Sequence, residues 1–435
     1  MKNILIISSC FLLLTTFISC EDFQATNFEQ VNQGFLTYSS GFGQTEGVRI
    51  SSYGDEEGYI LLGNTDSGND ENYFIVKTDI KGNIIWAKSH GDLRVDNKSR
   101  DLIVEDGIIY ILGDQYNDTL ERIIPFTTAF DLESGQRIND FNINLADSID
   151  NLLIYEEESA NLLLFNDIKK KVIASTALNI DGFNTGNVYL IDEGNLIEAV
   201  AKVDIEDPTL KFNLDVNGVK RIGSTNSFYL VATVTNKPTN YAGFMIVKYT
   251  IDETNGGFSS TQSWDFSPGY ETRVEDFLIV DSDKLMVLNR SGDILWGDVI
   301  SLPNGSSDGI PLTSLRFGDN MSLGKAATAS KLGGNAFMVT TVKDNNGLIV
   351  EKLTLGQDGL KREWGDRIWL ENQAFNNLSS YDKEKNNQIR NDIGNAILRK
   401  DGGFTIIGTH DFLDMTKMCL MQLDDEGYYV EDNVE

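Results

Sequence analysis

From about residue 45 onward, the chain alternates short apolar runs with polar turns, a pattern typical of β-strands. Runs such as Tyr59-Ile60-Leu61-Leu62 and Tyr229-Leu230-Val231 are apolar at consecutive positions. Such runs fit strands that are buried on both faces, whereas a helix repeats its apolar positions about every 3.6 residues. Gly, Asn, Asp and Ser between the runs suit tight turns. The pattern predicts an all-β chain, with one short helix expected around residues 382 to 393.

Two segments far apart in the chain share one order of features. Gly58 to Thr65 leads to Phe74 to Gly82, and Gly402 to His410 leads to Cys419 to Gly427. In each segment a turn glycine precedes an apolar strand, a small residue, a polar loop, a second strand, and a turn with Asp and Gly. Weaker copies bring the number to seven, with apolar strands that start at Gly58, Gly107, Ala160, Ser227, Asp283, Gly334 and Gly403.

The spacing of these copies selects the architecture. Successive starts lie between 49 and 69 residues apart, which is long for a solenoid and close to the propeller blade of about 40 to 50 residues. The two longest intervals predict insertions near 195–218 and 370–392. We therefore predict a single β-propeller over residues 34–435, with seven blades and with six or eight as alternatives. Because residues 35–41 resemble residues 85–91, an N-terminal strand is expected to complete the last blade.

Tryptophan recurs at one place in this pattern. Trp86, Trp296 and Trp364 follow a turn glycine by four or five residues, and Trp264 occupies a comparable place without the glycine. A large flat ring repeated at one structural position is expected to fill the wedge between adjacent blades. A sugar-stacking platform is the alternative.

The units resemble those of propeller-like repeat lipoproteins and secreted proteins of bacteria, which read roughly D-G-G-h-h-h-h-G followed by h-h-K-h-D-x-x-G-x-h-x-W, where h is apolar. The resemblance covers nearly all of residues 45–435 and is specific in the first and last units. It implies a fold and no activity, because propellers carry many unrelated functions.

The N-terminus has the pattern of an export signal. Lys2 precedes an apolar run from Ile4 to Ile18 that is too short to span a bilayer comfortably, since spanning takes about 20 apolar residues. Phe17-Ile18-Ser19-Cys20 resembles the lipobox of bacterial lipoproteins, with Phe in place of the usual Leu. The resemblance implies that residues 1–19 are a signal peptide, that Cys20 is the lipidated first residue, and that residues 20–33 are a tether. Several acyl chains, palmitate among them, make such an anchor stable.

The residues after Cys20 bear on location. Glu21-Asp22 resembles the acidic signal with which some Gram-negative lipoproteins reach the outer face of the outer membrane. We therefore expect an outer-membrane lipoprotein that is exposed at the cell surface. Placement on the inner leaflet, facing the periplasm, stays open as the alternative.

Composition indicates how the chain is stabilised and which partners are disfavoured. With 41% apolar and 10% aromatic residues, the chain can bury a sizeable core, so disorder is not expected. A formal net charge of −30 disfavours nucleic acid and anionic lipid as partners. Cys10 is expected to leave with the signal peptide and Cys20 to be lipidated, so Cys419 has no disulfide partner within the chain. It lies in a strand-like run, where we expect an inert buried thiol.

The sequence contains little that indicates catalysis. His90 and His410 are the two histidines, each at the expected end of a strand, and no metal or nucleophile motif is present. Polar loops at 66–72 and 343–347 offer oxygen atoms of the kind that Ca²⁺ binds, without the full alternating spacing, so a solvated hairpin loop is favoured. We assign no catalytic residue and no cofactor.

Three interpretations of function remain. The first, which we favour, is a lipid-anchored propeller that acts as a platform for a glycan, a peptide or a partner protein. The second is a propeller-type enzyme that acts on polysaccharide through a carboxylate pair, which 66 acidic residues leave open. The third is a structural accessory subunit of an outer-membrane assembly.

Overall fold

The computed structural model describes residues 31 to 430, with gaps. The segments outside the described residues are 1–30, 33–35, 39–43, 56, 67–70, 91–96, 118–120, 145–153, 180–181, 193–196, 204–211, 237–240, 267–271, 293, 305–308, 318–322, 344–346, 370–391, 413–414, 429 and 431–435.

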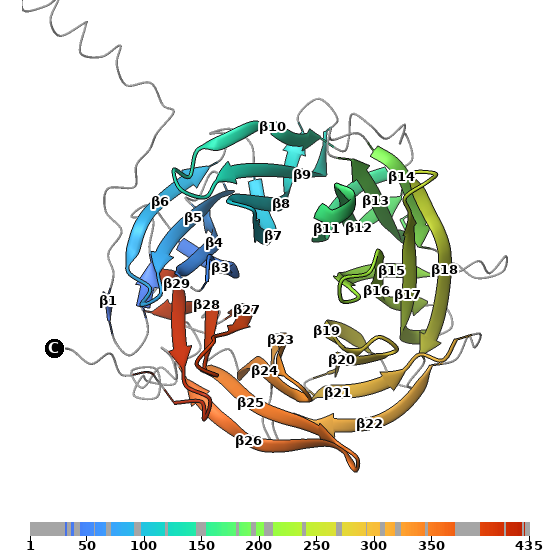
Figure 1. Cartoon of the computed structure of the whole chain (residues 1–435). Helices are drawn as coiled ribbons and strands as arrows, with labels where there is room; N and C mark the ends of the chain where they lie inside the picture. Colours follow the sequence, from blue (N-terminus) through green and yellow to red (C-terminus); the bar gives the residue numbers. More distant parts are fainter. Residues whose placement is uncertain are drawn as a thin grey trace, which may run out of the picture.

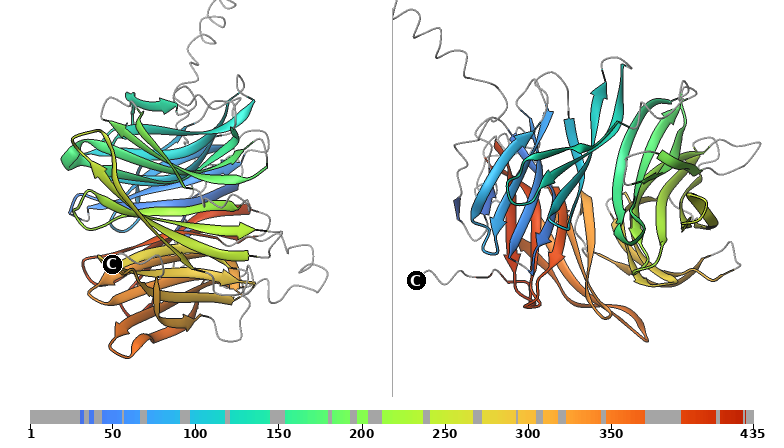
Figure 2. Two further views of the ribbon diagram at one scale, coloured as in Figure 1. Left: turned by 90° about the vertical axis from the view of Figure 1, so that its right-hand side faces the viewer. Right: turned by 45° about the horizontal axis from the view of Figure 1, so that its top comes forward.

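Seven antiparallel sheets surround a central axis and form a β-propeller (Figure 1). Figure 2 shows the same ring from two further directions, with the twisted blades standing side by side. In six of the blades the first strand in chain order lies innermost, and the innermost strands of neighbouring blades contact one another around the whole ring. The prediction of an all-β, seven-bladed propeller is confirmed.

Six blades are built from four consecutive strands each, ordered from the axis outward. Blade 1 is β3 (Gln44–Tyr53), β4 (Gly58–Asp66), β5 (Glu71–Asp79) and β6 (Ile84–His90). Blade 2 is β7 (Asn97–Glu105), β8 (Ile108–Asn117), β9 (Arg122–Asp131) and β10 (Arg137–Asn144). Blade 3 is β11 (Ile154–Phe165), β12 (Lys170–Asn179), β13 (Asn184–Asp192) and β14 (Ile197–Val203).

The second half of the ring repeats this order. Blade 4 is β15 (Asn213–Arg221), β16 (Ser227–Asn236), β17 (Tyr241–Asp252) and β18 (Gly257–Phe266). Blade 5 is β19 (Arg273–Asp281), β20 (Lys284–Ser291), β21 (Ile294–Ser301) and β22 (Ile310–Arg316). Blade 6 is β23 (Leu323–Gly333), β24 (Ala336–Lys343), β25 (Gly347–Gly356) and β26 (Gly359–Trp369).

Blade 7 combines both ends of the chain. Its inner strands are β27 (Asp392–Leu398), β28 (Phe404–Phe412) and β29 (Met415–Leu423), and its outer strands are β2 (Leu36–Tyr38) and β1 (Val31–Asn32). The N-terminal strand β2 pairs antiparallel with β29, with Leu36 opposite Leu420 and Tyr38 opposite Met418. This pairing closes the ring, as the resemblance between residues 35–41 and 85–91 predicted.

The core is divided among the seams between blades. Seven hydrophobic clusters are present in the described residues, and each joins two neighbouring blades. In β4, Ile60 and Leu62 pack between blades 1 and 2, whereas Tyr59 and Leu61 pack between blades 7 and 1. All four are at most 1% exposed. Consecutive positions are therefore apolar because both faces of an inner strand are covered, which confirms the two-sided burial expected from the sequence.

The third repeat was assigned to the wrong strand of its blade. The copy that starts at Ala160 lies in the innermost strand β11, whereas the other six copies begin at or next to a second strand. The turn before the second strand β12 contains a short 3-10 turn, Asn166–Ile168, and no glycine. Lys169 takes the left-handed conformation there, with φ of 55°. Without a turn glycine, the sequence pattern had no marker for β12.

This shift explains the long interval from which an insertion near 195–218 was predicted. Where that range is described, it contains β14 and the beginning of β15, which are regular strands of blades 3 and 4 and contradict an insertion there, and residues 195–196 and 204–211 lie outside the described residues. The second expected insertion, near 370–392, lies mostly outside the described residues. The helix expected around 382 to 393 is contradicted at its end, where Asp392 and Ile393 begin β27, and its remainder also lies outside the described residues.

Candidate functional site

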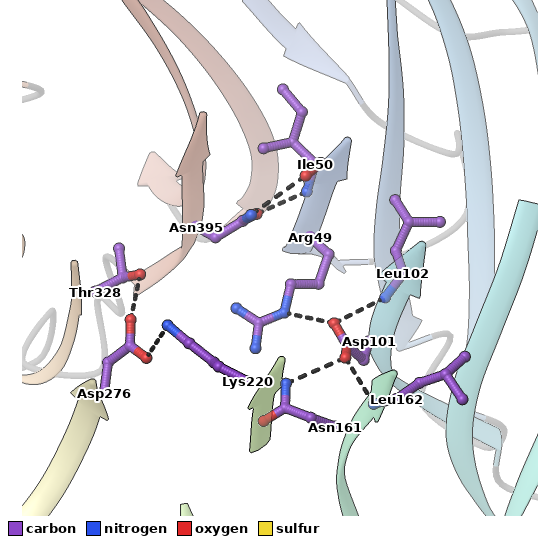
Figure 3. Close-up of polar contacts among 10 residues, drawn as sticks. All are labelled: Arg49, Ile50, Asp101, Leu102, Asn161, Leu162, Lys220, Asp276, Thr328 and Asn395. Carbon is purple, nitrogen blue, oxygen red and sulfur yellow. Dashed lines mark hydrogen bonds and ion pairs between the residues drawn. The ribbon is translucent and has the colours of Figure 1, made fainter. Parts of the chain in front are cut away.

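Each of the seven innermost strands contributes one polar side chain to a layer around the axis. We call this layer the axial ring, and Figure 3 shows it together with Ile50, Leu102 and Leu162, whose backbone groups it binds. Its members, in blade order, are Arg49, Asp101, Asn161, Lys220, Asp276, Thr328 and Asn395.

A bulge in the innermost strand precedes the axial ring in most blades. In β7 the register shifts between Ser99 and Asp101, and the innermost strands of blades 1, 3, 4, 5 and 7 shift at the equivalent place. A bulge adds one residue to a strand and re-aims the side chain that follows it. In blade 4 the residue after the bulge is Gly218, and Lys220 reaches the ring from two positions further along β15.

Asp101 ties three successive blades together. Its Oδ1 accepts hydrogen bonds from Arg49 Nε of blade 1 at 3.1 Å and from the backbone N–H of Leu102 at 3.0 Å. Its Oδ2 accepts from Asn161 Nδ2 at 3.1 Å and from the backbone N–H of Leu162 at 2.9 Å, both in blade 3. The carboxylate thus receives four hydrogen bonds, and charge-assisted bonds of this kind are stronger than neutral ones.

Asp276 repeats the same arrangement in blades 4, 5 and 6. Its Oδ1 accepts from Lys220 Nζ at 3.0 Å and from the N–H of Phe277 at 2.7 Å. Its Oδ2 accepts from Thr328 Oγ1 at 3.0 Å and from the N–H of Ala329 at 2.9 Å. We call Asp101 and Asp276, with their four donors each, the two aspartate clamps.

The charges around the second clamp favour the ionised carboxylate. Burial by itself disfavours ionisation of Asp276, but the Lys220 ammonium, the Ala329 N–H and the Arg49 guanidinium outweigh that effect. The pKa of the Asp276 carboxyl therefore lies below its ordinary value. Arg49 belongs to blade 1, so its charge acts on Asp276 from another part of the ring.

Blade 7 is joined to its neighbours by neutral groups. Asn395 Oδ1 accepts from the N–H of Ile50 at 2.7 Å, and Asn395 Nδ2 donates to the carbonyl of Ile50 at 3.2 Å. Toward blade 6, Ser330 Oγ donates to the carbonyl of Ala396 at 2.7 Å. The amide of Asn395 is therefore used in both directions, as a backbone peptide would be.

A second set of contacts, which we call the clasps, lies further from the axis. At five seams a side chain of a second strand accepts the backbone N–H of the residue before the next blade's bulge, at 2.8 to 3.0 Å. The acceptors are Asn64, Asp114, Thr176, Thr233 and Thr409, and the matching donors are Ser99, Ser159, Val216, Val274 and Gly47. The polar groups of the inner strands thus act largely as joints between blades.

The tryptophans mostly fill seams, as expected. Trp86, Trp264 and Trp364 lie on fourth strands, and each packs against a cluster shared by two blades. Trp264 is 1% exposed, and its Nε1 donates to the carbonyl of Pro303 in the next blade at 3.3 Å. Such a covered ring offers no stacking surface to a sugar. Trp296 departs from the pattern because it lies on the third strand β21.

Of the cysteines and the possible Ca²⁺-binding loops named in the sequence analysis, only Cys419 is fully described by the structure. Cys20 lies outside the described residues. Cys419 is 1% exposed in β29, and burial raises the pKa of its thiol to about 12, as expected of an inert buried thiol. The loops at 66–72 and 343–347 lie largely outside the described residues. In the described part of the chain, no three His, Cys, Asp or Glu side chains gather to hold a metal ion.

The two histidines occupy strand positions near those expected. His410 is in β28 opposite Lys417, and His90 ends β6. The His90 ring lies 4.3 Å from the ring of Phe130 and 5.9 Å from that of Tyr73. Burial, aided by the charges of Lys88 and Arg137, lowers the pKa of His90 to about 4.

This burial of His90 makes the fold sensitive to acid. The pKa of His90 is lower in the folded chain than in the unfolded chain, so its contribution to stability is fully present above pH 6.5. The free energy of unfolding then falls as the pH drops toward 4. We expect the His90→Phe variant to lose less stability than the wild type between pH 7.5 and 4.5, by on the order of 2 to 3 kcal/mol. Urea unfolding at both pH values measures this difference. An equal decrease in the free energy of unfolding in the two proteins would contradict the lowered pKa of His90.

Comparisons with known proteins agree on the fold alone. No protein-family model matches the chain, and no curated protein matches its sequence. Drosophila Semaphorin 2a is 8% identical, with a TM-score of 0.50 over 92% of this chain and 75% of that one. The Nup133 β-propeller domain of Vanderwaltozyma polyspora is 12% identical, with a TM-score of 0.48 over 91% of this chain and 100% of that one.

A third similar structure is the NanB sialidase of Streptococcus pneumoniae. It is 8% identical, with a TM-score of 0.43 over 93% of this chain and 70% of the sialidase chain. Identities this low carry no information on activity or partners. Within the described residues, no helix is long and apolar enough to cross a membrane.

Proposed function

We propose that this chain is a lipid-anchored, exported β-propeller that acts as a binding or interaction platform at the outer membrane, exposed at the cell surface. The observation that carries the platform role is the use of the axial ring. Asp101 and Asp276 each accept four hydrogen bonds, three of which come from neighbouring blades, so their lone pairs are engaged. A carboxylate held in this way is poorly placed to act as a general acid or base, which favours binding over hydrolysis.

The two ends of the ring differ in a way that supports this role. Because the strands are antiparallel, the connections from one blade to the next leave from the end that also carries the connections between second and third strands. The opposite end carries tight turns with left-handed glycines, such as Gly54 and Gly82. The chain passes from one blade to the next at the first end, as between Asn144 and Ile154. Since rigid scaffolds usually bind through loops and not through tight turns, we assign recognition to this end.

The position of β2 is compatible with an anchor. β2 and β1 form the outer edge of blade 7, on the side of the ring where β6 also lies (Figure 1). Val31 lies eleven positions after Cys20, and a chain of that length spans at most about 40 Å. An anchor on Cys20 would therefore hold the ring by its rim, and both ends would remain accessible to a partner.

The anchor is tested by expressing the full chain and its Cys20→Ala variant in a Gram-negative host. We expect the wild type to fractionate with the outer membrane, to incorporate labelled palmitate, and to be cleaved by protease added to intact cells. The Cys20→Ala variant should lose the label and leave the membrane fraction. Equal membrane association of the two proteins would contradict lipidation at Cys20, and protection of the wild type from protease would place it on the inner leaflet.

The platform role is tested with the same wild-type protein on a glycan array and against envelope proteins by cross-linking. We expect saturable binding without release of reducing ends. Release of reducing ends would show a polysaccharide-acting enzyme instead. Absence of a glycan ligand together with one stoichiometric protein partner would indicate an accessory subunit.

A further inference from the structure

The axial ring presents donors and positive charge toward the axis. Arg49 and Lys220 extend from blades 1 and 4 toward the middle of the ring (Figure 3). Their side chains are 28% and 35% exposed, so both are in contact with solvent. The paired aspartates are more covered, at 11% for Asp101 and 20% for Asp276. The cations are therefore the more accessible members of both ion pairs.

The carboxylate acceptors of this layer are already engaged. Both carboxylate oxygens of Asp101 and of Asp276 accept two hydrogen bonds each, half of them from backbone N–H groups. The carbonyl oxygen of Asn395 accepts the N–H of Ile50. The two carboxylates are stabilised by backbone N–H groups as well as by the cations Arg49 and Lys220. The carboxylates therefore keep their backbone hydrogen bonds when an anion shares the cations with them.

Lys220 has donors to spare. Its ammonium carries three N–H bonds, and among the described residues only Asp276 Oδ1 accepts one of them, while the ring of Phe277 lies 5.1 Å from Nζ. The guanidinium of Arg49 adds a second charge that also points into the middle of the ring (Figure 3), and it helps to lower the pKa of the Asp276 carboxyl. Two cations that point into one space attract an anion between them.

We propose that the axial ring is a binding site for an oxyanion, a carboxylate, phosphate or sulfate, held between Lys220 and Arg49. The anion is either a free ion or the acidic group of a larger ligand. The site goes beyond the platform role and does not depend on it, because a free ion can bind here even if no glycan or protein partner exists.

The test is calorimetric titration of the full chain, purified in detergent, with inorganic phosphate at constant ionic strength. We expect one site with a dissociation constant near the millimolar range, and a loss of about tenfold or more in the Lys220→Met variant, since one charge-assisted bond is removed. Lys220→Arg should retain binding. Lys361→Met is the matched control, because Lys361 is a cation in an exposed pair with Asp358 and lies outside the axial ring. Phosphate binding that is unchanged in Lys220→Met would overturn the proposal.

A second measurement keeps the test decisive if Lys220→Met fails to fold. Phosphate should raise the unfolding temperature of the wild type above its value in chloride at equal ionic strength, because it binds the folded state. A titration with an oligouronate, compared with the neutral oligosaccharide of equal length, shows whether the anion is a free ion or the acidic group of a larger ligand. Oligouronate binding that competes with phosphate identifies an acidic group of a larger ligand, and binding of phosphate alone identifies a free ion. No binding of phosphate or oligouronate to the wild type would overturn the proposal, whatever the glycan array shows.

Discussion

Replacing Asp101 with leucine is expected to lower the free energy of unfolding by about 3 kcal/mol or more. The substitution leaves the Arg49 guanidinium, the Asn161 amide and the backbone N–H of Leu162 without their acceptor. All three contacts link different blades, so their loss loosens two seams at once. Urea unfolding at neutral pH, followed by circular dichroism, measures the change.

Two further variants serve as comparisons for Asp101→Leu. Asp101→Asn keeps one oxygen acceptor in the same shape and should cost less than Asp101→Leu. Asp358→Leu removes the carboxylate of an exposed pair, in which Asp358 is 81% and Lys361 59% exposed, and should stay within about 0.5 kcal/mol of the wild type. If Asp101→Leu were as stable as Asp358→Leu, the clamp would not hold the blades together.

Tyr38→Ala is expected to destabilise the ring by about 3 to 5 kcal/mol. Tyr38 is completely buried in the closing strand β2, and its ring belongs to the cluster between blades 7 and 1. Its hydroxyl donates to the carbonyl of Gly82 in blade 1 at 2.7 Å. The alanine variant therefore leaves a cavity at the seam that closes the propeller. Thermal and urea unfolding both report the loss.

The contributions of the ring and the hydroxyl can be separated. Tyr38→Phe removes only the bond to Gly82 and should cost about 1 kcal/mol. Tyr428→Ala changes a tyrosine that is 47% exposed, so a cost within about 0.5 kcal/mol is expected. Equal stability of Tyr38→Ala and Tyr428→Ala would mean that β2 does not contribute to closure.

The architecture could be predicted because burial on both faces leaves a signal in single strands. Runs such as Tyr59 to Leu62 are apolar at every position, and turn glycines such as Gly107 and Gly402, with φ of 76° and 86°, mark where such strands begin. The error in blade 3 has the same origin, since Lys169 takes the left-handed conformation without being a glycine. A pattern that depends on glycine cannot find a turn that does without it.

The axial ring was missed because its residues carry no recognised motif. A weak signal exists in the order of a polar residue followed by apolar ones in the strand before each turn, as in Asp101-Leu102-Ile103, Asp276-Phe277-Leu278 and Asn161-Leu162-Leu163. Such triplets are common in any sequence, and only the bulge makes them equivalent. The convergence of Arg49 and Lys220 from blades 1 and 4 depends on ring closure and has no local signature.

The clasps bind main chain, and this has a consequence for how such a ring can arise. Each acceptor, from Asn64 to Thr409, bonds to a backbone N–H of its neighbour, which every residue except proline supplies. A duplicated blade that carried such an acceptor on its second strand would therefore find a donor on the next blade, whatever side chains that next blade carried. As far as the clasps are concerned, the blades at these five seams are interchangeable.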